Sequence, residues 1–235
     1  MRPWRVLERV DSTDGPLELR QRGDRDFLIT ISGRILMNSS AHRSEAALAE
    51  LVCREVTGSG APRMLLGGLG MGLTLRAALD ALPPRAHLKV AELNGAIVDW
   101  CRGPLADLNG RAAEDPRVEI VLRDVAGVIV DAERRFDAIL LDLYVGPAGA
   151  ADAGSPFYGT RALATTRAAL APGGIFGVWA ERPDAAFEKR LRAAGFAFAK
   201  QRPGRGGLRH VVYVARSPAE HASSGRSRAG FHARE

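Results

Sequence analysis

From residue 63 onward, short apolar runs alternate with amphipathic segments, and this alternation constrains the fold more than any other feature of the sequence. Strands buried under helices on both faces of a parallel sheet appear as nearly continuous apolar runs. Runs of this kind occur at 63–68, 87–93, 117–122, 136–144 and 175–181. Helical periodicity at 73–82, from 96 and within 160–170 separates them. The pattern therefore predicts an α/β fold with helices on both faces of a largely parallel sheet.

The two ends of the chain follow other patterns. Residues 1–42 predict a β-rich segment, because short alternating runs at 4–10, 16–21 and 26–32 are separated by turn residues. Residues 43–216 form the predicted catalytic domain. Near its end, FEKRLRAAGFAFAKQ and GLRHVVYVA predict a helix and two strands, with an antiparallel hairpin at the sheet edge. Residues 217–235 are expected to be a disordered basic tail.

Composition and charge narrow the classes of partner. The net charge of +6 comes entirely from the last 36 residues, because residues 1–199 hold 25 basic and 25 acidic residues. Basic residues scattered through a polar tail do not form a phosphate-binding footprint, so no nucleic-acid partner is expected. No apolar run approaches the roughly 18 residues of a membrane span. The N-terminus lacks the features of a signal peptide.

Cysteine and histidine usage gives two further expectations. Cys53 and Cys101 show no CxxC spacing, which is typical of a protein in a reducing cytoplasm. The five histidines show no ligand spacing either, so no metal site is expected.

The glycine-rich stretch LLGGLGMG predicts a ligand site. Gly67, Gly68, Gly70 and Gly72 follow a predicted strand and precede a predicted helix, where open parallel sheets bind ligands. The spacing is GxGxG, whereas a dinucleotide fingerprint would place its third glycine at Leu73. No Gly-Lys-Ser/Thr follows, which excludes a P-loop. Free backbone amides at the helix start favour a polar or negatively charged ligand group.

Acidic residues at the ends of three predicted strands extend this site. Glu92 stands at the position from which a carboxylate accepts hydrogen bonds from both ribose hydroxyls. Asp124 either meets an adenine ring or caps the next helix. Asp142 follows three apolar residues, and a carboxylate there is costly unless solvated or paired, which favours a functional role. Tyr144 either contacts the ligand or packs at the rim.

Five segments in order resemble the spermidine synthase-like branch of the S-adenosylmethionine-dependent methyltransferase fold: LLGGLGMGLTLRAAL, VAELNGAIVDW, DPRVEIVLRDVAGVI, RFDAILLDLYVGP and ALAPGGIFGVW. The resemblance implies a Rossmann-like sheet of seven strands ending in an antiparallel hairpin. It also implies a small N-terminal β-domain, a possible homodimer, and S-adenosylmethionine or its decarboxylated form as the donor.

The resemblance assigns roles residue by residue. It implies that the 67–72 loop binds the nucleoside, that Glu92 and its neighbour Leu93 meet the ribose, and that Asp124 and Val125 meet the adenine. It implies that Asp142 faces both donor and acceptor.

Two carboxylates of the polyamine-making members are missing. The family's loop aspartate falls on Gly70, and a second aspartate after the fourth strand falls on Val145. Each of these carboxylates would contribute about 1.5–3 kcal/mol through charge-assisted hydrogen bonds to a cation. An uncharged loop tolerates the carboxylate of intact S-adenosylmethionine better than an aspartate would.

On these grounds we expect an alkyl transferase acting on a small nucleophilic acceptor, with methyl transfer preferred. Asp142 would accept or orient the acceptor's proton, and Tyr144 would shape the pocket. The alternative is a polyamine aminopropyltransferase in which other acidic residues, such as Asp152, replace the missing pair. A nucleoside-binding protein without catalysis is a further alternative. A nicotinamide oxidoreductase is disfavoured by the glycine spacing.

Overall fold

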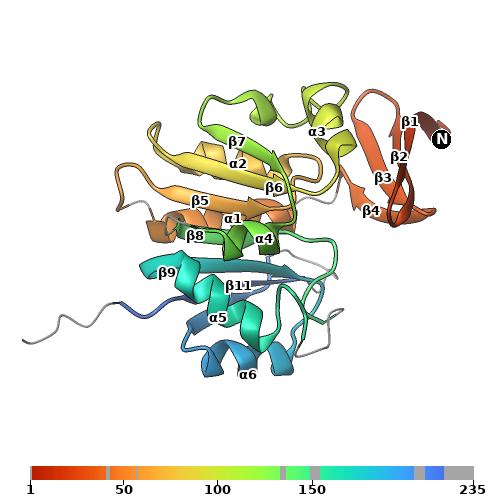
Figure 1. The fold of residues 1–235 in the computed structure, drawn as a ribbon. Helices are drawn as coiled ribbons and strands as arrows, with labels where there is room; N and C mark the ends of the chain where they lie inside the picture. The colour runs from red at the N-terminus through yellow and green to blue at the C-terminus, as the bar shows by residue number, and fades with distance from the viewer. Residues whose placement is uncertain are drawn as a thin grey trace, which may run out of the picture.

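The computed structural model describes residues 2–40, 43–56, 58–132, 136–148, 154–203 and 210–219. Two sheets organise them (Figure 1). A four-stranded antiparallel sheet comprises β1 (Arg5–Ser12), β2 (Gly15–Arg22), β3 (Asp26–Ile31) and β4 (Arg34–Asn38). The sequence predicted the first three of these strands and missed β4, which follows β3 after a two-residue turn at Ser32 and Gly33, both with positive φ.

The second sheet has seven strands in the order β10-β11-β9-β8-β5-β6-β7. Its strands are β5 (Arg63–Gly67), β6 (His87–Glu92), β7 (Val118–Leu122), β8 (Phe136–Leu141), β9 (Leu170–Ala180), β10 (Ala197–Gln201) and β11 (Val211–Arg216). Strands β5 to β9 are parallel to one another, whereas β11 is antiparallel to both β9 and β10. The predicted α/β fold with an antiparallel hairpin at one edge is therefore confirmed.

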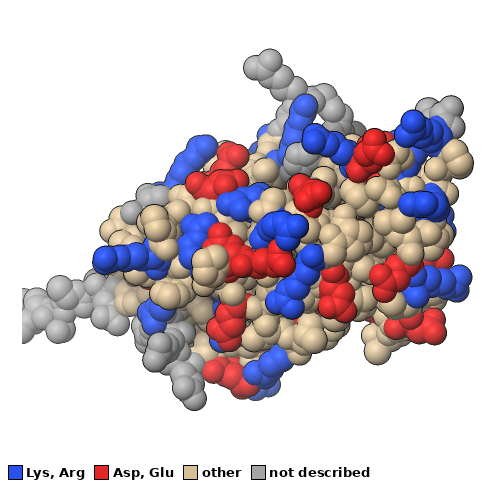
Figure 2. Space-filling view, turned by 90° about the horizontal axis from the view of Figure 1, so that it is seen from above, with Lys and Arg blue, Asp and Glu red and all other residues tan. Residues whose placement is uncertain are grey.

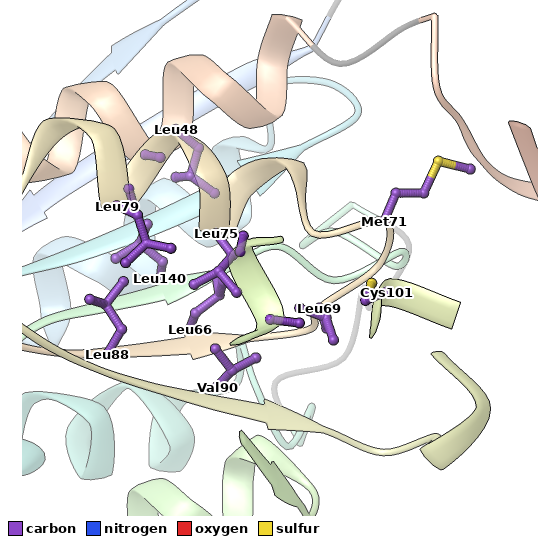
Figure 3. Packing of buried hydrophobic residues seen from close by; sticks show 14 of the residues in the cluster. Leu48, Leu66, Leu69, Met71, Leu75, Leu79, Leu88, Val90, Cys101 and Leu140 are labelled. Carbon is purple, nitrogen blue, oxygen red and sulfur yellow. The ribbon is translucent and has the colours of Figure 1, made fainter. Parts of the chain in front are cut away.

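Helices cover both faces of this sheet. They are α1 (Arg43–Val56), α2 (Leu73–Ala81), α3 (Gly95–Arg102), α4 (Val125–Val130), α5 (Thr160–Ala169) and α6 (Ala185–Ala193). Residues of α1, α2 and α3 share one apolar cluster with Leu66 and Val90, while α4, α5 and α6 share another with Leu65 and Ile139. Figure 3 shows Leu48 of α1 and Leu75 of α2 packed toward the first face. Adjacent residues of β5 thus point into opposite cores, as expected for a strand buried on both sides.

The small sheet is fixed to the large domain by its own apolar face. Leu17, Leu19 and Ile29 are buried in the same cluster as Met71 and Trp100. The Trp100 indole also donates from Nε1 to the Glu8 carboxylate at 2.9 Å. Figure 1 shows the small sheet beyond the carboxyl ends of β5 and β6, where it stands over the glycine loop.

Two boundaries differ from the sequence-based prediction. Strand β9 begins at Leu170 and continues through the Pro-Gly-Gly turn, with a register irregularity opposite β8 and with Gly173 at φ 74°. Ser217 donates from its backbone amide to the Gly174 carbonyl, and Gly173 donates to the Pro218 carbonyl. The rest of the predicted tail, from 220 on, lies outside the described residues.

On the face shown in Figure 2, acidic and basic side chains are interspersed over the described surface. Within the described ranges, no helix has the length and apolarity needed to cross a bilayer. Those same ranges contain no group of three His, Cys, Asp or Glu residues arranged to hold a metal ion.

Candidate active site

The glycine loop packs tightly between the ends of two neighbouring strands. Gly68 adopts φ 89°, and its amide donates to the Ala91 carbonyl of β6 at 2.9 Å. A Cβ atom at Gly68 would lie 2.7 Å from the Asp142 carbonyl oxygen. Gly70 at φ 53° and Gly72 at φ 78° continue the left-handed path into α2. Only glycine adopts these conformations at this closeness without strain.

Glu92 is held rigidly beneath this loop. Its side chain is nearly buried, with 9 % exposure. One carboxylate oxygen accepts from the Leu69 amide and the other from the Asn94 amide, both at 2.8 Å. Each oxygen retains a lone pair for a second donor. The carboxylate is therefore oriented before any ligand arrives and remains able to accept hydrogen bonds from a diol.

Asp142 emerges directly after β8. Its amide donates to the Gly67 carbonyl at 3.0 Å, and its carboxylate accepts a hydrogen bond from the Thr74 hydroxyl of α2. Burial raises the pKa of Asp142 to about 7; the Thr74 hydrogen bond opposes this shift, and the negative charge of Glu45 adds to it. A carboxyl group with this pKa is suited to exchange protons near neutral pH.

A cavity of about 530 Å³ opens at this edge of the sheet. It brings together most of the residues predicted from the sequence: Gly68, Gly70, Glu92, Leu93, Asp124, Val125, Asp142 and Tyr144. The predicted Gly67 and Gly72 stand behind its wall instead. A Cβ at Gly67 would meet Leu141 and Val125, and one at Gly72 would meet Asn109, so close packing requires glycine at both positions.

Asp124 caps α4 and also lines the cavity, while its predicted contact with an adenine ring stays a prediction. Its side chain is exposed and lines the cavity, while one carboxylate oxygen accepts from the Ala126 amide at 2.9 Å as the N-cap of α4. Leu93 and Tyr144 lie at the rim, with 70 % and 49 % of their surfaces exposed. The capping bond leaves the second carboxylate oxygen of Asp124 available to a ligand.

Distant segments bring further residues to the cavity wall, and the sequence did not predict them as site residues. Met37 of β4 covers the loop so closely that a Cβ at Gly70 would overlap its sulfur. Glu45 comes from the first turn of α1, and Trp179 and Glu181 come from the end of β9. No local motif marks these positions, because only the tertiary fold places them against the loop. Asp152, the predicted substitute carboxylate, lies outside the described residues.

Glu45 belongs to a short hydrogen-bonded chain. The Ser44 hydroxyl is 2.8 Å from the Glu45 carboxylate and 3.0 Å from Nδ1 of His210. The His210 ring in turn packs edge-on against Trp179, with ring centroids 4.9 Å apart. The indole Nε1 of Trp179 is buried, with no hydrogen-bond partner within the described part of the chain. A buried donor of this kind usually meets a water or a bound molecule.

Charge on the cavity wall is predominantly negative. Among the lining residues, six carry carboxylates and one carries a guanidinium: Asp14, Glu45, Glu92, Asp124, Asp142 and Glu181 against Arg123. Arg123 forms an ion pair with Asp131 at 2.7 Å, which offsets its charge. Such a wall favours a cationic ligand.

The cysteine beneath the loop is inert. Cys101 is fully buried and donates from Sγ to the Gly70 carbonyl at 3.3 Å. Burial, with a further contribution from Glu92, raises the pKa of Cys101 to about 12. The thiol therefore stays protonated near neutral pH, which disfavours it as a nucleophile.

Comparisons with known proteins agree with this geometry. Residues 64–190 match the family model described as the spermine/spermidine synthase domain. The polyamine aminopropyltransferase of Mycobacterium tuberculosis is 30 % identical over 190 residues, which cover 75 % of this chain and 34 % of the relative. The polyamine aminopropyltransferase of Prochlorococcus marinus is 32 % identical over 124 residues, 52 % of this chain and 42 % of the relative. The chain thus spans about a third of the length of the first of these relatives and less than half of the second.

Solved structures support the fold. Spermidine synthase from Thermotoga maritima superposes with a TM-score of 0.71 at 19 % identity, covering 92 % of this chain and 74 % of that one. A spermidine synthase in complex with the transition-state analogue AdoDATO gives a TM-score of 0.70 at 19 % identity, covering 92 % of this chain and 73 % of that one. At this level of identity the likeness concerns architecture alone.

Proposed function

The chain belongs to the spermine/spermidine synthase family, and from this membership we propose that it transfers an aminopropyl group from decarboxylated S-adenosylmethionine to a small amine. The observation that carries the proposal is the acidic cavity wall, with six carboxylates and one paired arginine. Both substrates are cations near neutral pH, and carboxylates in a crevice partly shielded from solvent bind cations strongly.

The residues present fit the donor. Glu92 is oriented to accept hydrogen bonds from the ribose hydroxyls, and Asp124 has a free oxygen for the adenine edge. Ile97 and Val125 add apolar surface for the base. The left-handed backbone at Gly68 and Gly70 brings the loop close to the sulfonium end.

Asp142 is the proposed base. The neutral amine of the acceptor attacks the propyl carbon attached to sulfur, so that a C–N bond forms while the C–S bond breaks. The electron pair of the broken bond stays on sulfur, which leaves as the neutral thioether methylthioadenosine. The proton lost by the amine passes to the Asp142 carboxylate, whose orientation Thr74 fixes.

Methyl transfer, the preference drawn from the sequence alone, receives less support. That preference depended on the two missing family carboxylates. The 67–72 loop indeed carries no acidic side chain, but Glu45, Glu181 and Asp14 bring negative charge to the same cavity from other segments. Family membership and cavity charge together favour the alternative, aminopropyl transfer.

Product analysis tests the proposal. Purified protein is incubated with decarboxylated or intact S-adenosylmethionine in the presence of putrescine, and the nucleoside product is identified by mass spectrometry. Methylthioadenosine formed only when both putrescine and the decarboxylated donor are present is the expected result. S-adenosylhomocysteine formed from the intact donor would instead establish methyl transfer. Binding of methylthioadenosine without turnover of either donor would favour the non-catalytic alternative.

A further inference from the structure

Two runs of three consecutive apolar residues line the cavity, and the proposed donor site uses neither of them. One run lies in β4 and the other follows β8, and together they form an apolar rim: Ile35, Leu36, Met37, Leu143, Tyr144 and Val145. We propose that this rim binds an apolar substituent of the acceptor, so that the acceptor is an amine carrying an alkyl or arylalkyl chain. The inference rests on the proposed aminopropyl transfer and specifies the class of acceptor.

A β-bulge in β4 brings the first run to the cavity. Met37 pairs with Ile29 of β3 and Ile35 pairs with Thr30, so Leu36 is an extra residue between them. In a regular strand, successive side chains point to opposite faces, and only alternate residues would reach one cavity. A bulge redirects the side chains around the extra residue, and residues 35–37 all line the cavity. The bulge therefore gives the small sheet a continuous apolar surface there.

Exposed apolar side chains concentrate at this cavity. The described ranges hold seven exposed large hydrophobic side chains, and four of them line it: Ile35, Leu93, Tyr144 and Val145. Leu93 directly follows Glu92, which is assigned to the donor, so the other three remain for the acceptor. Single exposed apolar residues are common on proteins, whereas a group of them at one cavity indicates a binding surface. Covering the rim with an apolar group would remove its contact with water, which favours binding.

The rim lies close to the place of reaction. Tyr144 and Val145 follow Asp142 by two and three residues, which limits the Cα–Cα distances to about 7 and 11 Å. On the other run, Met37 covers the glycine loop so closely that a Cβ at Gly70 would overlap its sulfur. A chain of several carbons on an amine held at Asp142 is therefore long enough to contact the rim.

Charge and apolar surface suit two parts of one ligand. The half-buried carboxylates of Glu45 and Asp142 suit the cationic centres, which are the donor sulfonium and the reacting amine. Asp14 and Glu181 also line the cavity, but they are exposed, so water and salt screen their charges. A second ammonium on the acceptor would have to lie against the apolar rim and lose part of its hydration. An amine with one charge and an apolar chain matches both kinds of surface.

Two aromatic side chains extend the apolar surface beyond the rim. Phe157 and Trp179 both line the cavity. Phe157 packs edge-on against Tyr158, with ring centroids 6.0 Å apart, and Trp179 packs in the same way against His210. Rings held in place by their neighbours bind an alkyl or aryl group with little further loss of side-chain freedom. They therefore favour an apolar chain over a polar substituent.

The test compares primary amines that differ in chain length and in second charge. Rates with decarboxylated S-adenosylmethionine are measured for 1-aminopropane, 1-aminobutane, 1-aminohexane and 1,6-diaminohexane. In the wild type we expect kcat/KM to rise about two- to fourfold per added methylene, which is the gain from burying that group. We expect 1-aminohexane to exceed 1,6-diaminohexane at least about tenfold, because the rim does not solvate a second charge. Equal rates along the series, or a preference for the diamine, would overturn the inference and leave aminopropyl transfer established.

Polar variants of the rim locate the effect. Val145→Thr keeps the shape of the side chain and Ile35→Thr keeps its β-branching, and both positions are exposed, so the fold should be retained. In the double variant we expect kcat/KM for 1-aminohexane to fall about five- to tenfold and that for 1-aminopropane less than about twofold. Val6→Thr, at an exposed position of the same small sheet that does not line the cavity, is the matched control and should change neither. Equal losses for the long and the short amine would overturn the inference.

A binding measurement separates this inference from the proposed reaction. Calorimetric titration of 1-aminohexane into the complex with methylthioadenosine needs no turnover. Binding that weakens at least about fivefold in the Ile35→Thr/Val145→Thr double variant supports the inference even if no aminopropyl transfer is detected. Binding that is absent from the wild type, or unchanged in the double variant, overturns it even if the enzyme is active.

A second copy of the chain is the competing occupant of the rim. Light scattering gives the mass in solution of the wild type and of the Ile35→Thr/Val145→Thr double variant. We expect the two masses to be equal, because the rim faces a ligand. A lower mass for the double variant, together with rates that do not depend on amine chain length, would assign the rim to contact between copies and overturn the inference.

Discussion

The two sides of the cavity are built in different ways. The proposed donor side, comprising the 67–72 loop, Glu92 and Asp124, comes from consecutive strand–helix units, and backbone amides orient its carboxylates. The proposed acceptor side, comprising Met37, Glu45 and Trp179, comes from β4, α1 and β9, which are far apart in the sequence.

The two sides of the cavity differ in which residues can be replaced without disturbing the fold. On the donor side, position 68 accepts only glycine, because a Cβ there would meet the Asp142 backbone. A substitution in this loop would therefore displace the edge of the sheet as well. On the acceptor side, side chains from separate elements line the wall, and one can be replaced without moving the strands.

Asp142 stands where the two sides meet, and replacing it is the strongest way to separate them. We expect Asp142→Asn to lower kcat by about 10²- to 10⁴-fold, the usual contribution of a general base, because the amide cannot accept the amine proton. Methylthioadenosine affinity, measured by calorimetry, should change by less than about threefold, since Glu92 and Asp124 remain. A large loss of nucleoside affinity would show that the two sides are not separable.

The donor side itself is tested at Glu92. Glu92→Gln places an amide group against the amides of Leu69 or Asn94 and removes the charge that the ribose would meet. We expect methylthioadenosine binding to weaken about 10- to 100-fold, corresponding to about 1.5–3 kcal/mol for hydrogen bonds to a charged group. Glu119→Gln, which removes a surface ion pair with Lys89 at 3.1 Å, is the matched control and should leave affinity unchanged.

The same contrast explains how much could be predicted from the sequence. Glycine spacing, strand ends and apolar periodicity are local signals, and they predicted the sheet and its antiparallel edge. They also led to Gly68, Glu92 and Asp142, which line one cavity in the structure. Asp124 was left between two roles because an N-cap and a ligand contact have the same local signature.

The missed features depend on tertiary contacts. Glu45 reads as an ordinary acidic residue in a first helical turn, and Trp179 reads as part of a buried strand. Gly67 and Gly72 resemble loop glycines that touch a ligand, yet close packing against Val125 and Asn109 accounts for them. A spacing pattern cannot distinguish a glycine needed for a ligand from one needed for a neighbour.

The contact between Met37 and Gly70 joins the two sides and can be measured as a coupling. Gly70→Ala places a Cβ in a left-handed residue and against the Met37 thioether, so it combines backbone strain with overlap. We expect a loss of about 2–3 kcal/mol in the free energy of unfolding, measured with urea. Met37→Ala in the same chain should recover at least about 0.5 kcal/mol of it.

Gly33→Ala provides the control for strain alone. Gly33 has φ 77°, and a Cβ atom added there would meet nothing within 4 Å, so this variant should lose only about 1 kcal/mol. Additive effects of Gly70→Ala and Met37→Ala would show that the small sheet does not press on the loop.

The pH dependence of the reaction has the smallest expected effect, and it tests whether Asp142, which lies between the two sides, is the base. Because the pKa of free Asp142 is raised to about 7, its carboxyl group is protonated below that pH and cannot accept the amine proton. The attacking amine must also be neutral, which makes the rate of every variant fall as pH decreases. We therefore expect the wild-type kcat/KM to fall more steeply below about pH 7 than the residual rate of Asp142→Asn, by about a further tenfold per pH unit.

Asp142 also links protonation to stability, which checks the same pKa without any turnover. The folded state binds more protons than the unfolded state between the ordinary aspartate pKa and about 7, so the contribution of Asp142 to stability decreases as pH rises through that window. Urea unfolding of the wild type should therefore show a loss of stability between about pH 4 and pH 7 that Asp142→Asn reduces. Equal stability–pH profiles for the wild type and Asp142→Asn would show that another group titrates in this range. The decrease in kcat/KM at low pH would then have to be assigned to that group and not to Asp142.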